Sequence, residues 1–91
     1  RAYDCIGRYG GEEFLIICRK TTKENAFVLA EKLRILITEF KFDEIGHKTI
    51  SLGISDFQKS DTVETLFKKA DTALYEAKNT GRDKSVIYKV E

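Results

Sequence analysis

Residues 8–14 read Arg-Tyr-Gly-Gly-Glu-Glu-Phe, and residues 10–13 among them lie between two strand-like segments, 3–9 and 14–18. Two short strand-like runs joined by a pair of glycines are typical of a β-hairpin. The glycines carry no side-chain bulk, so a ligand can approach the backbone closely. The two carboxylates that follow supply oxygen atoms, which are the donors that hard cations such as Mg²⁺ prefer. The stretch therefore predicts a hairpin whose tip is either a binding site or a solvated acidic turn.

The position of the two carboxylates decides whether one ion can use both. Neighbouring residues of a strand point to opposite faces, so Glu12 and Glu13 can share a metal only in or beside the turn. They fall at that place in the sequence. The pair Gly10-Gly11 also has a purely structural explanation, because tight turns with positive φ favour glycine. From the spacing alone both explanations stay open.

Two amphipathic helices are predicted after the hairpin. Thr21 with Glu24, and Asp61 with Glu64, match the capping-box spacing at which helices begin. Gly81 stands where a helix commonly ends. Apolar residues recur at i, i+3, i+4 and i+7 in two stripes: Ala26, Leu29, Ala30, Leu33, Leu36, Ile37 and Phe40, then Val63, Leu66, Phe67, Ala70, Ala73, Leu74 and Ala77.

The remaining segments complete an α+β pattern. Residues 49–55 and 85–90 predict strands, and residues 43–48 predict a loop. The order hairpin, helix, strand, helix, strand indicates a sheet with helices packed on one face or both. The sequence contains no proline, low-complexity tract or internal repeat, so no domain boundary is predicted within it.

Composition excludes several classes of function. The 16 Lys and Arg residues nearly balance 15 Asp and Glu residues, so no strong field favours a nucleic acid polymer or an anionic membrane. No run is long enough to span a membrane and no signal-peptide pattern is present, which predicts a cytoplasmic location with any membrane anchor in segments outside these residues. Cys5 and Cys18 are too few for a disulfide framework. They are expected to be small core residues, although a hairpin centred on Gly11-Glu12 would place them opposite each other.

Four motifs together resemble the GGDEF family, the diguanylate cyclases. Residues 8–14 match its GGEEF form, and residues 1–4 match its RxxD inhibitory motif, with five residues between Asp4 and the first glycine. Residues 49–55 resemble the family's next strand, and residues 70–82 its ADxALYxAKxxGR helix end. The resemblance implies a ferredoxin-like palm, similar to nucleotidyl cyclases, with an antiparallel-rich sheet. It also implies that residues 1–91 are the C-terminal half of a GGDEF domain, without its N-terminal half.

The resemblance implies an enzyme that condenses two GTP molecules into cyclic di-GMP and two pyrophosphates within a homodimer. Glu12 would be the essential catalytic carboxylate, and Glu12 and Glu13 would together bind Mg²⁺ or Mn²⁺. The nucleotide would lie against the bare backbone of Gly10 and Gly11. Because the family's leading metal-binding Asp lies in the other half of the domain, the 91 residues alone are expected to be inactive.

Two pairs of charged residues complete the site that the resemblance implies. Lys78 and Arg82 would hold the triphosphate, although cations at a helix C-terminus are favourable for structural reasons alone. Arg1 and Asp4 would bind the product cyclic di-GMP as an inhibitor, although an exposed ion pair is the plain alternative. A GGDEF domain without turnover, acting as a cyclic di-GMP receptor or an interaction module, is the alternative function.

Overall fold

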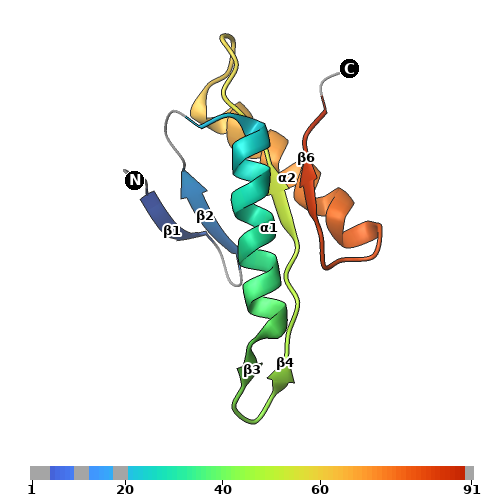
Figure 1. The fold of residues 1–91 in the computed structure, drawn as a ribbon. Coiled ribbons are helices and arrows are strands. Elements are labelled where there is room, and N and C mark those ends of the chain that lie inside the picture. Colours follow the sequence, from blue (N-terminus) through green and yellow to red (C-terminus); the bar gives the residue numbers. More distant parts are fainter. Residues whose placement is uncertain (1–4, 10–12, 18–20, 90–91) are drawn as a thin grey trace.

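The structure is a computed structural model that describes the backbone of residues 5–9 and 13–17 and all atoms of residues 21–89. The described chain folds as two strands, a helix, three short strands, a second helix and a last strand (Figure 1). In chain order these are β1 (Cys5–Tyr9), β2 (Glu13–Ile17), α1 (Lys23–Glu39), β3 (Lys41–Phe42), β4 (Gly46–His47), β5 (Leu52–Ile54), α2 (Val63–Asn79) and β6 (Ser85–Ile87). The predicted α+β class is confirmed, and so is the predicted order of the larger elements.

The first two strands form the predicted hairpin. β1 and β2 are antiparallel, with Tyr9 opposite Glu13 and Cys5 opposite Ile17. This register is centred on residue 11. A pairing of Cys5 with Cys18 would need a hairpin centred between residues 11 and 12. The cross-strand pairing of the two cysteines is therefore wrong, because a shift of one residue in register changes the partner of every strand residue. Cys18 itself lies outside the described residues.

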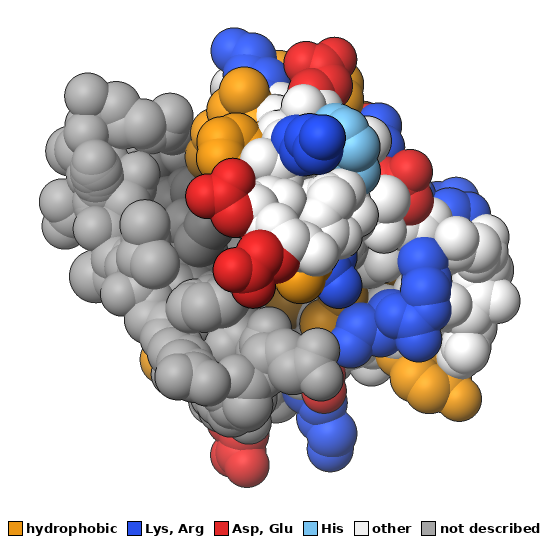
Figure 2. Space-filling view, turned by 90° about the horizontal axis from the view of Figure 1, so that it is seen from below, with side chains coloured by type: hydrophobic (Ala, Val, Ile, Leu, Met, Phe, Trp, Pro, Cys, Tyr) orange, Lys and Arg blue, Asp and Glu red, His pale blue; other side chains and the backbone are white. Residues whose placement is uncertain are grey.

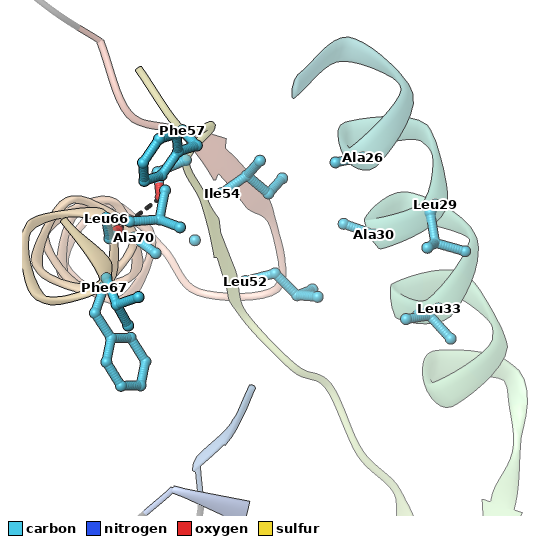
Figure 3. A pocket seen from close by; sticks show the side chains of 13 residues that line it. Ala26, Leu29, Ala30, Leu33, Leu52, Ile54, Phe57, Leu66, Phe67 and Ala70 are labelled. Atoms are coloured by element: carbon cyan, nitrogen blue, oxygen red, sulfur yellow. Dashed lines mark hydrogen bonds between the residues drawn. The ribbon is translucent and has the colours of Figure 1, made fainter. Parts of the chain in front are cut away.

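β5 and β6 form a layer that lies between the two helices α1 and α2. They pair in parallel, with Leu52, Gly53 and Ile54 opposite residues 85, 86 and 87. A parallel pair needs a long crossover, and α2 supplies it. Leu52 and Ile54 point toward α1 (Figure 3), whereas a side chain at Gly53 would meet the backbone of α2. The helices therefore cover opposite faces of this ladder.

The predicted apolar stripes are only partly buried. Within residues 21–89 the buried apolar residues are Ala30, Ile54, Ala73 and Ala77. By contrast, Leu36, Phe40 and Val63, which belong to the predicted stripes, are more than half exposed. A helix of 17 residues is about 25 Å long, whereas a strand of three residues covers only about 10 Å. The strands therefore cover only part of each stripe, and Leu36, Phe40 and Val63 lie outside the covered part.

Both helices begin one residue later than predicted. Thr22, rather than Thr21, caps α1 by accepting a hydrogen bond from the backbone of Asn25. Thr62, rather than Asp61, caps α2 and forms a reciprocal capping box with Thr65. Each cap stands in a pair of adjacent residues that can both cap a helix, so the sequence leaves an ambiguity of one residue. The predicted helix end is confirmed, since Gly81 follows the C-cap Thr80 of α2 with φ 122°.

The segment predicted as a loop at 43–48 contains part of a small hairpin. β3 and β4 are antiparallel, with Lys41 opposite His47 and Phe42 opposite Gly46. Glu44 and Gly46 have φ values of 73° and 75°, which lie in the left-handed region that tight turns use. The Nδ1 atom of His47 lies 3.0 Å from the carbonyl oxygen of Thr38, so β4 also contacts the last turn of α1. The alternation of apolar and polar residues could not predict β3 and β4, because each strand has only two residues.

A nearly buried ion pair stabilises the start of α2 and predicts an acid-dependent stability. The ammonium of Lys69 lies 2.5 Å from Oδ2 of Asp61, whose side chain is 9% exposed. The same carboxylate accepts hydrogen bonds from the backbone N–H of Gln58 and the hydroxyl of Thr65. Lys69 first, and then these two donors, lower the pKa of Asp61 from 3.8 to about 2.

The sign of the pH effect follows from this lowered pKa. A carboxylate with a lower pKa in the folded state stabilises the fold fully above its unfolded pKa, and the contribution is lost as pH falls through the folded pKa. We expect Asp61→Asn to be less stable than the wild type near neutral pH, with the difference vanishing between about pH 4 and pH 2. Urea denaturation at several pH values measures this. Lys69→Met is the matched variant and should flatten the same dependence; equal acid dependence in wild type and Asp61→Asn would contradict the assignment.

Candidate functional site

Three of the eight predicted site residues can be located in the structure. The other five lie outside the described residues, and their roles stay predictions: Arg1, Asp4, Gly10, Gly11 and Glu12. Glu13 is the first residue of β2 and stands opposite Tyr9, directly after the turn of the hairpin. Lys78 and Arg82 lie at the end of α2. The structure therefore shows the predicted site in atomic detail only at the end of α2.

The last turn of α2 carries Lys78 and ends at the C-cap Thr80. The backbone N–H of Thr80 donates to the carbonyl oxygen of Glu76 at 3.0 Å, and that of Arg82 donates to Ala77 at 2.9 Å. The second bond runs from the second residue after the C-cap back into the last turn, as in a Schellman motif. The Nζ atom of Lys84 also contacts Thr80, through both its carbonyl oxygen and its hydroxyl. The carbonyl oxygens of Glu76, Ala77 and Thr80 therefore accept hydrogen bonds from backbone N–H groups and from Lys84, and not from the guanidinium of Arg82.

The turn after α2 has an unusual backbone. Gly81, Arg82 and Asp83 have φ values of 122°, 60° and 52°, three consecutive residues in the region that L side chains rarely adopt. Such a conformation costs on the order of 1–3 kcal/mol at each non-glycine residue, and it persists only where surrounding contacts hold it. Arg82 is exposed on this turn. Its guanidinium makes no ion pair or side-chain hydrogen bond with residues 21–89.

Two side chains from distant parts of the sequence, Ser51 and Arg34, hold this turn, and Glu31 in turn binds Arg34. The hydroxyl of Ser51, just before β5, accepts a hydrogen bond from the backbone N–H of Asp83 at 3.1 Å. Arg34 of α1 donates from Nη1 to Oδ1 of Asp83 at 2.8 Å. The remaining face of Arg34 forms a fork with Glu31, with Nε–Oε2 and Nη2–Oε1 distances of 3.0 and 2.8 Å. The Arg34 guanidinium lowers the pKa of Glu31, and both carboxylates raise the pKa of Arg34.

This arrangement is suited to binding an anion such as a phosphate. Figure 2 shows Lys and Arg side chains gathered where α2 ends, on the face seen from the β3–β4 end. Lys78 and Arg82 lie four residues apart on either side of the helix terminus. Arginine can bind phosphate through two parallel hydrogen bonds, and lysine contributes a compact charge. The exposed Arg82 is thus available to a ligand.

An apolar groove elsewhere in the structure lacks the charged side chains that are found at the end of α2. It lies between α1, β5 and α2 and has a volume of about 220 Å³ (Figure 3). None of its lining residues is titratable; they are Ala26, Leu29, Ala30, Leu33, Leu52, Gly53, Ile54, Ser55, Phe57, Val63, Leu66, Phe67 and Ala70. The hydroxyl of Ser55 is already used, since it donates to the carbonyl oxygen of Leu66 at 2.8 Å. A triphosphate would find no cationic partner in this groove.

The described residues contain neither a metal-binding cluster nor a membrane span. Among the side chains that the structure describes, no three from His, Cys, Asp or Glu gather closely enough to hold an ion. The predicted metal pair is not among them, because Glu12 is not described and Glu13 is described only by its backbone. Neither α1 nor α2 is long and apolar enough to cross a bilayer.

Sequence reasoning missed Arg34, Asp83 and Ser51. The spacing of Glu31 and Arg34, three residues apart on one helix, is typical of an ion pair and could have indicated half of this cluster. No local signal could have linked Arg34 to Asp83, because 49 residues separate them. The cluster exists only because α1 packs beside the turn that leads into β6.

Comparisons with known proteins agree with the resemblance seen in the sequence. A family model described as "Diguanylate cyclase, GGDEF domain" matches residues 1–84. The diguanylate cyclase DgcM of Escherichia coli K12 is 34% identical over 84 residues, which are 92% of this chain and 20% of that protein. The response regulator PleD of Caulobacter vibrioides is 39% identical over 89 residues, with 91% of this chain and 20% of that protein covered. The chain thus spans about one fifth of the length of these curated relatives.

Solved structures share the fold over nearly the whole chain. The active GGEEF domain of a diguanylate cyclase from Vibrio cholerae matches 99% of this chain with a TM-score of 0.92 and 35% identity, and 59% of that chain is covered. The GGDEF domain of DgcB from Caulobacter crescentus, in complex with c-di-GMP, matches 96% of this chain with a TM-score of 0.87 and 25% identity, and 53% of that chain is covered. These likenesses confirm the predicted palm fold.

Proposed function

This chain belongs to the GGDEF family of diguanylate cyclase domains, and from that premise we propose that it is part of an enzyme that condenses two GTP molecules into cyclic di-GMP and two pyrophosphates. The observation that carries the proposal is the likeness to the active GGEEF domain, with a TM-score of 0.92 over 99% of this chain. Because only 59% of that domain is covered, the activity is proposed for a protein that carries this chain, and not for the 91 residues alone.

The proposed reaction consists of two nucleotidyl transfers. The 3′-oxygen of each GTP forms a bond to the α-phosphorus of the other, and the bond from that phosphorus to the β-bridging oxygen breaks. Pyrophosphate leaves with the electron pair of the broken bond, and the proton of the 3′-hydroxyl is released. Since two nucleotides must face each other in line, two domains, each holding one GTP, would form the site as a homodimer.

The hairpin would supply the groups that act nearest the reacting atoms. Glu12 and Glu13 offer the carboxylate oxygens that suit Mg²⁺ or Mn²⁺, and an ion bound there supplies neutralisation of triphosphate charge. Glu12 would also accept the proton of the attacking hydroxyl. Gly10 and Gly11 would let the nucleotide approach the backbone. The register that puts Glu13 opposite Tyr9 supports these roles, because it makes Glu13 the first residue of β2 after the tip of the hairpin.

The end of α2 would bind the leaving part of the substrate. Lys78 and Arg82 would hold the triphosphate, and the turn that presents Arg82 with its guanidinium exposed supports this role. Charge on the phosphates develops during the transfer, and fixed cations that need not reorganise stabilise it most effectively. A turn held by Ser51 and Arg34 would fix the backbone that carries this cation.

Product inhibition is proposed through Arg1 and Asp4. Arginine can bind phosphate and stack on a guanine face, and aspartate can accept hydrogen bonds from guanine. The proposal is supported by the solved DgcB domain in complex with c-di-GMP. A domain that binds cyclic di-GMP without turnover is the competing function, and it makes the opposite prediction for catalysis.

The first experiment measures product from GTP. A protein that carries this chain, incubated with GTP and Mg²⁺, is expected to release two pyrophosphates for each cyclic di-GMP formed, and to release neither when EDTA removes the metal. Chromatography of the nucleotides and a pyrophosphate assay measure the two products. Binding of cyclic di-GMP without any turnover would instead favour the receptor function.

A further inference from the structure

The conformation of the Arg82 turn is not a local property of its sequence. Glycine adopts positive φ without a steric cost, but Arg82 and Asp83 do so against their intrinsic preference. The Schellman bond from Arg82 to Ala77 accounts for the direction in which the chain leaves α2. It does not account for two successive non-glycine residues with positive φ. Contacts from elsewhere in the fold must hold Asp83, and with it the residue before it.

Arg34 is the contact that reaches this turn from the other helix. Its side chain is 20% exposed, and three of its nitrogen atoms are engaged: Nε and Nη2 by Glu31, and Nη1 by Asp83. A planar guanidinium bound along two edges cannot rotate without breaking one set of bonds. Glu31 thus sets the plane of Arg34, and Arg34 in turn sets the position of the Asp83 carboxylate.

A second anchor fixes the backbone of the same residue. Ser51 binds the N–H of Asp83, and one residue later the N–H of Leu52 donates to the carbonyl oxygen of Lys84 at 2.9 Å. The turn is therefore joined to the start of β5 on one side and to α1 on the other. Arg82 directly precedes the residue that bears both anchors. Any shift of Asp83 would move the backbone of Arg82, and with it the point from which the Arg82 side chain reaches a ligand.

We propose that Arg34, oriented by Glu31, is a positioning residue that holds the Asp83 turn so that Arg82 meets the substrate triphosphate in a fixed geometry. The inference rests on the proposed function, since it assigns to Arg34 the orientation of a phosphate-binding arginine. Arg34 does not itself touch the nucleotide, because its nitrogen atoms are occupied by two carboxylates. The ion pair links the packing of α1 to the affinity for GTP.

The test compares variants in a protein that carries this chain. Arg34→Gln removes the charge and the fork, and it is expected to raise the KM for GTP about tenfold, with a smaller change in kcat, because Arg82 binds phosphate in a less fixed geometry. Asp83→Asn keeps an acceptor oxygen for Arg34 and should stay closer to the wild type than Asp83→Ala. Asp61→Asn removes an ion pair at the opposite end of α2 and is the matched control, with an unchanged KM.

Coupling to Arg82 separates positioning from a merely structural role. If Arg34 acts through Arg82, then Arg34→Gln should raise KM little further in a protein that already carries Arg82→Gln. Fold changes that multiply in the double variant, or a KM for Arg34→Gln within twofold of the wild type, would overturn the proposal. Circular dichroism checks that each variant is folded.

The result for the wild type separates a failure of the proposed cyclase activity from a failure of the positioning role of Arg34. A wild-type protein that forms no cyclic di-GMP would contradict the proposed activity, and the positioning role would then be decided by calorimetry with GTP and Mg²⁺. In that measurement a Kd raised about tenfold by Arg34→Gln, and not raised further in the double variant, supports the role. Equal Kd values for wild type and Arg34→Gln, or no binding of GTP to the wild type, would reject it.

Discussion

Replacing Gly53 with alanine is expected to destabilise the fold by about 3 kcal/mol or more. A Cβ atom on Gly53 would lie 2.2 Å from the carbonyl oxygen of Ala70, and 2.3 and 2.8 Å from the N and Cα atoms of Leu74. All three are backbone atoms of α2, so no side-chain rotation can relieve the contact. The strand and the helix would have to separate, and the small residues Ala73 and Ala77, which are 1% and 0% exposed, would lose their packing.

Urea denaturation followed by circular dichroism measures this loss. Gly46→Ala is the matched control, because a Cβ atom there meets nothing within 4 Å but Gly46 has φ 75°. That substitution should cost only about 1–2 kcal/mol, which is the price of a left-handed backbone for alanine. A Gly53→Ala variant as stable as Gly46→Ala would show that β5 and α2 do not approach as closely as the structure indicates.

Glu12→Gln is expected to reduce the turnover of GTP about a thousandfold or more, while the fold stays intact. The substitution keeps the size of the side chain and removes the charge, so a divalent ion loses one of its two proposed protein carboxylates. Charge that develops on the transferred phosphate is then less neutralised, which raises the barrier of the chemical step. Glu12 lies outside the described residues, so this prediction depends on the sequence signature and on family membership.

Single-turnover measurement of cyclic di-GMP formation tests this effect on the chemical step. Glu24→Gln is the matched control, because Glu24 is an exposed glutamate in the first turn of α1, and its rate should equal that of the wild type. Retention of more than a tenth of the wild-type rate by Glu12→Gln would remove this carboxylate from the catalytic centre. Partial rescue of the variant by higher Mn²⁺ would support its role as a metal ligand.

The helices were the most predictable elements, and their ends show the limit of that prediction. Apolar spacing located both helices, and Gly81 marked the end of α2 correctly. The start of each helix was misplaced by one residue, because Thr21-Thr22 and Asp61-Thr62 each offer two side chains able to cap. The choice depends on neighbours in space: at the start of α2, Asp61 is engaged by Lys69 eight residues later, and Thr62 forms the cap.

The strand pairings were less predictable than the strands themselves. The hairpin of β1 and β2 follows from two adjacent runs around a glycine pair, and it was confirmed, although its register differs by one residue from that of a hairpin centred on Gly11-Glu12. The parallel pairing of β5 with β6 has no local signal, because more than 30 residues separate the partners. It depends on α2 crossing between them, and on a glycine at position 53 that lets the helix lie against the strand.

Some residues of the candidate site could be predicted from the sequence, and others could not. Sequence motifs alone singled out the carboxylates of the hairpin and the pair Lys78 and Arg82, since chemistry of this kind needs particular residue types at short spacings. They could not indicate that Arg34 and Ser51 hold the turn that presents Arg82. These contacts join segments far apart in the chain, and their existence depends on how α1 and β5 pack.

By itself the sequence determined the family, the α+β class, the two helices and the residue types available for phosphate and metal. Each of these depends on neighbouring residues, through hydrophobic periodicity, capping side chains and backbone freedom at glycine. Only the tertiary structure decided the cross-strand register, the close approach of β5 to α2 and the fixed conformation of the Arg82 turn. Each of these arises from contacts between distant segments, whose geometry follows from packing the whole chain into layers.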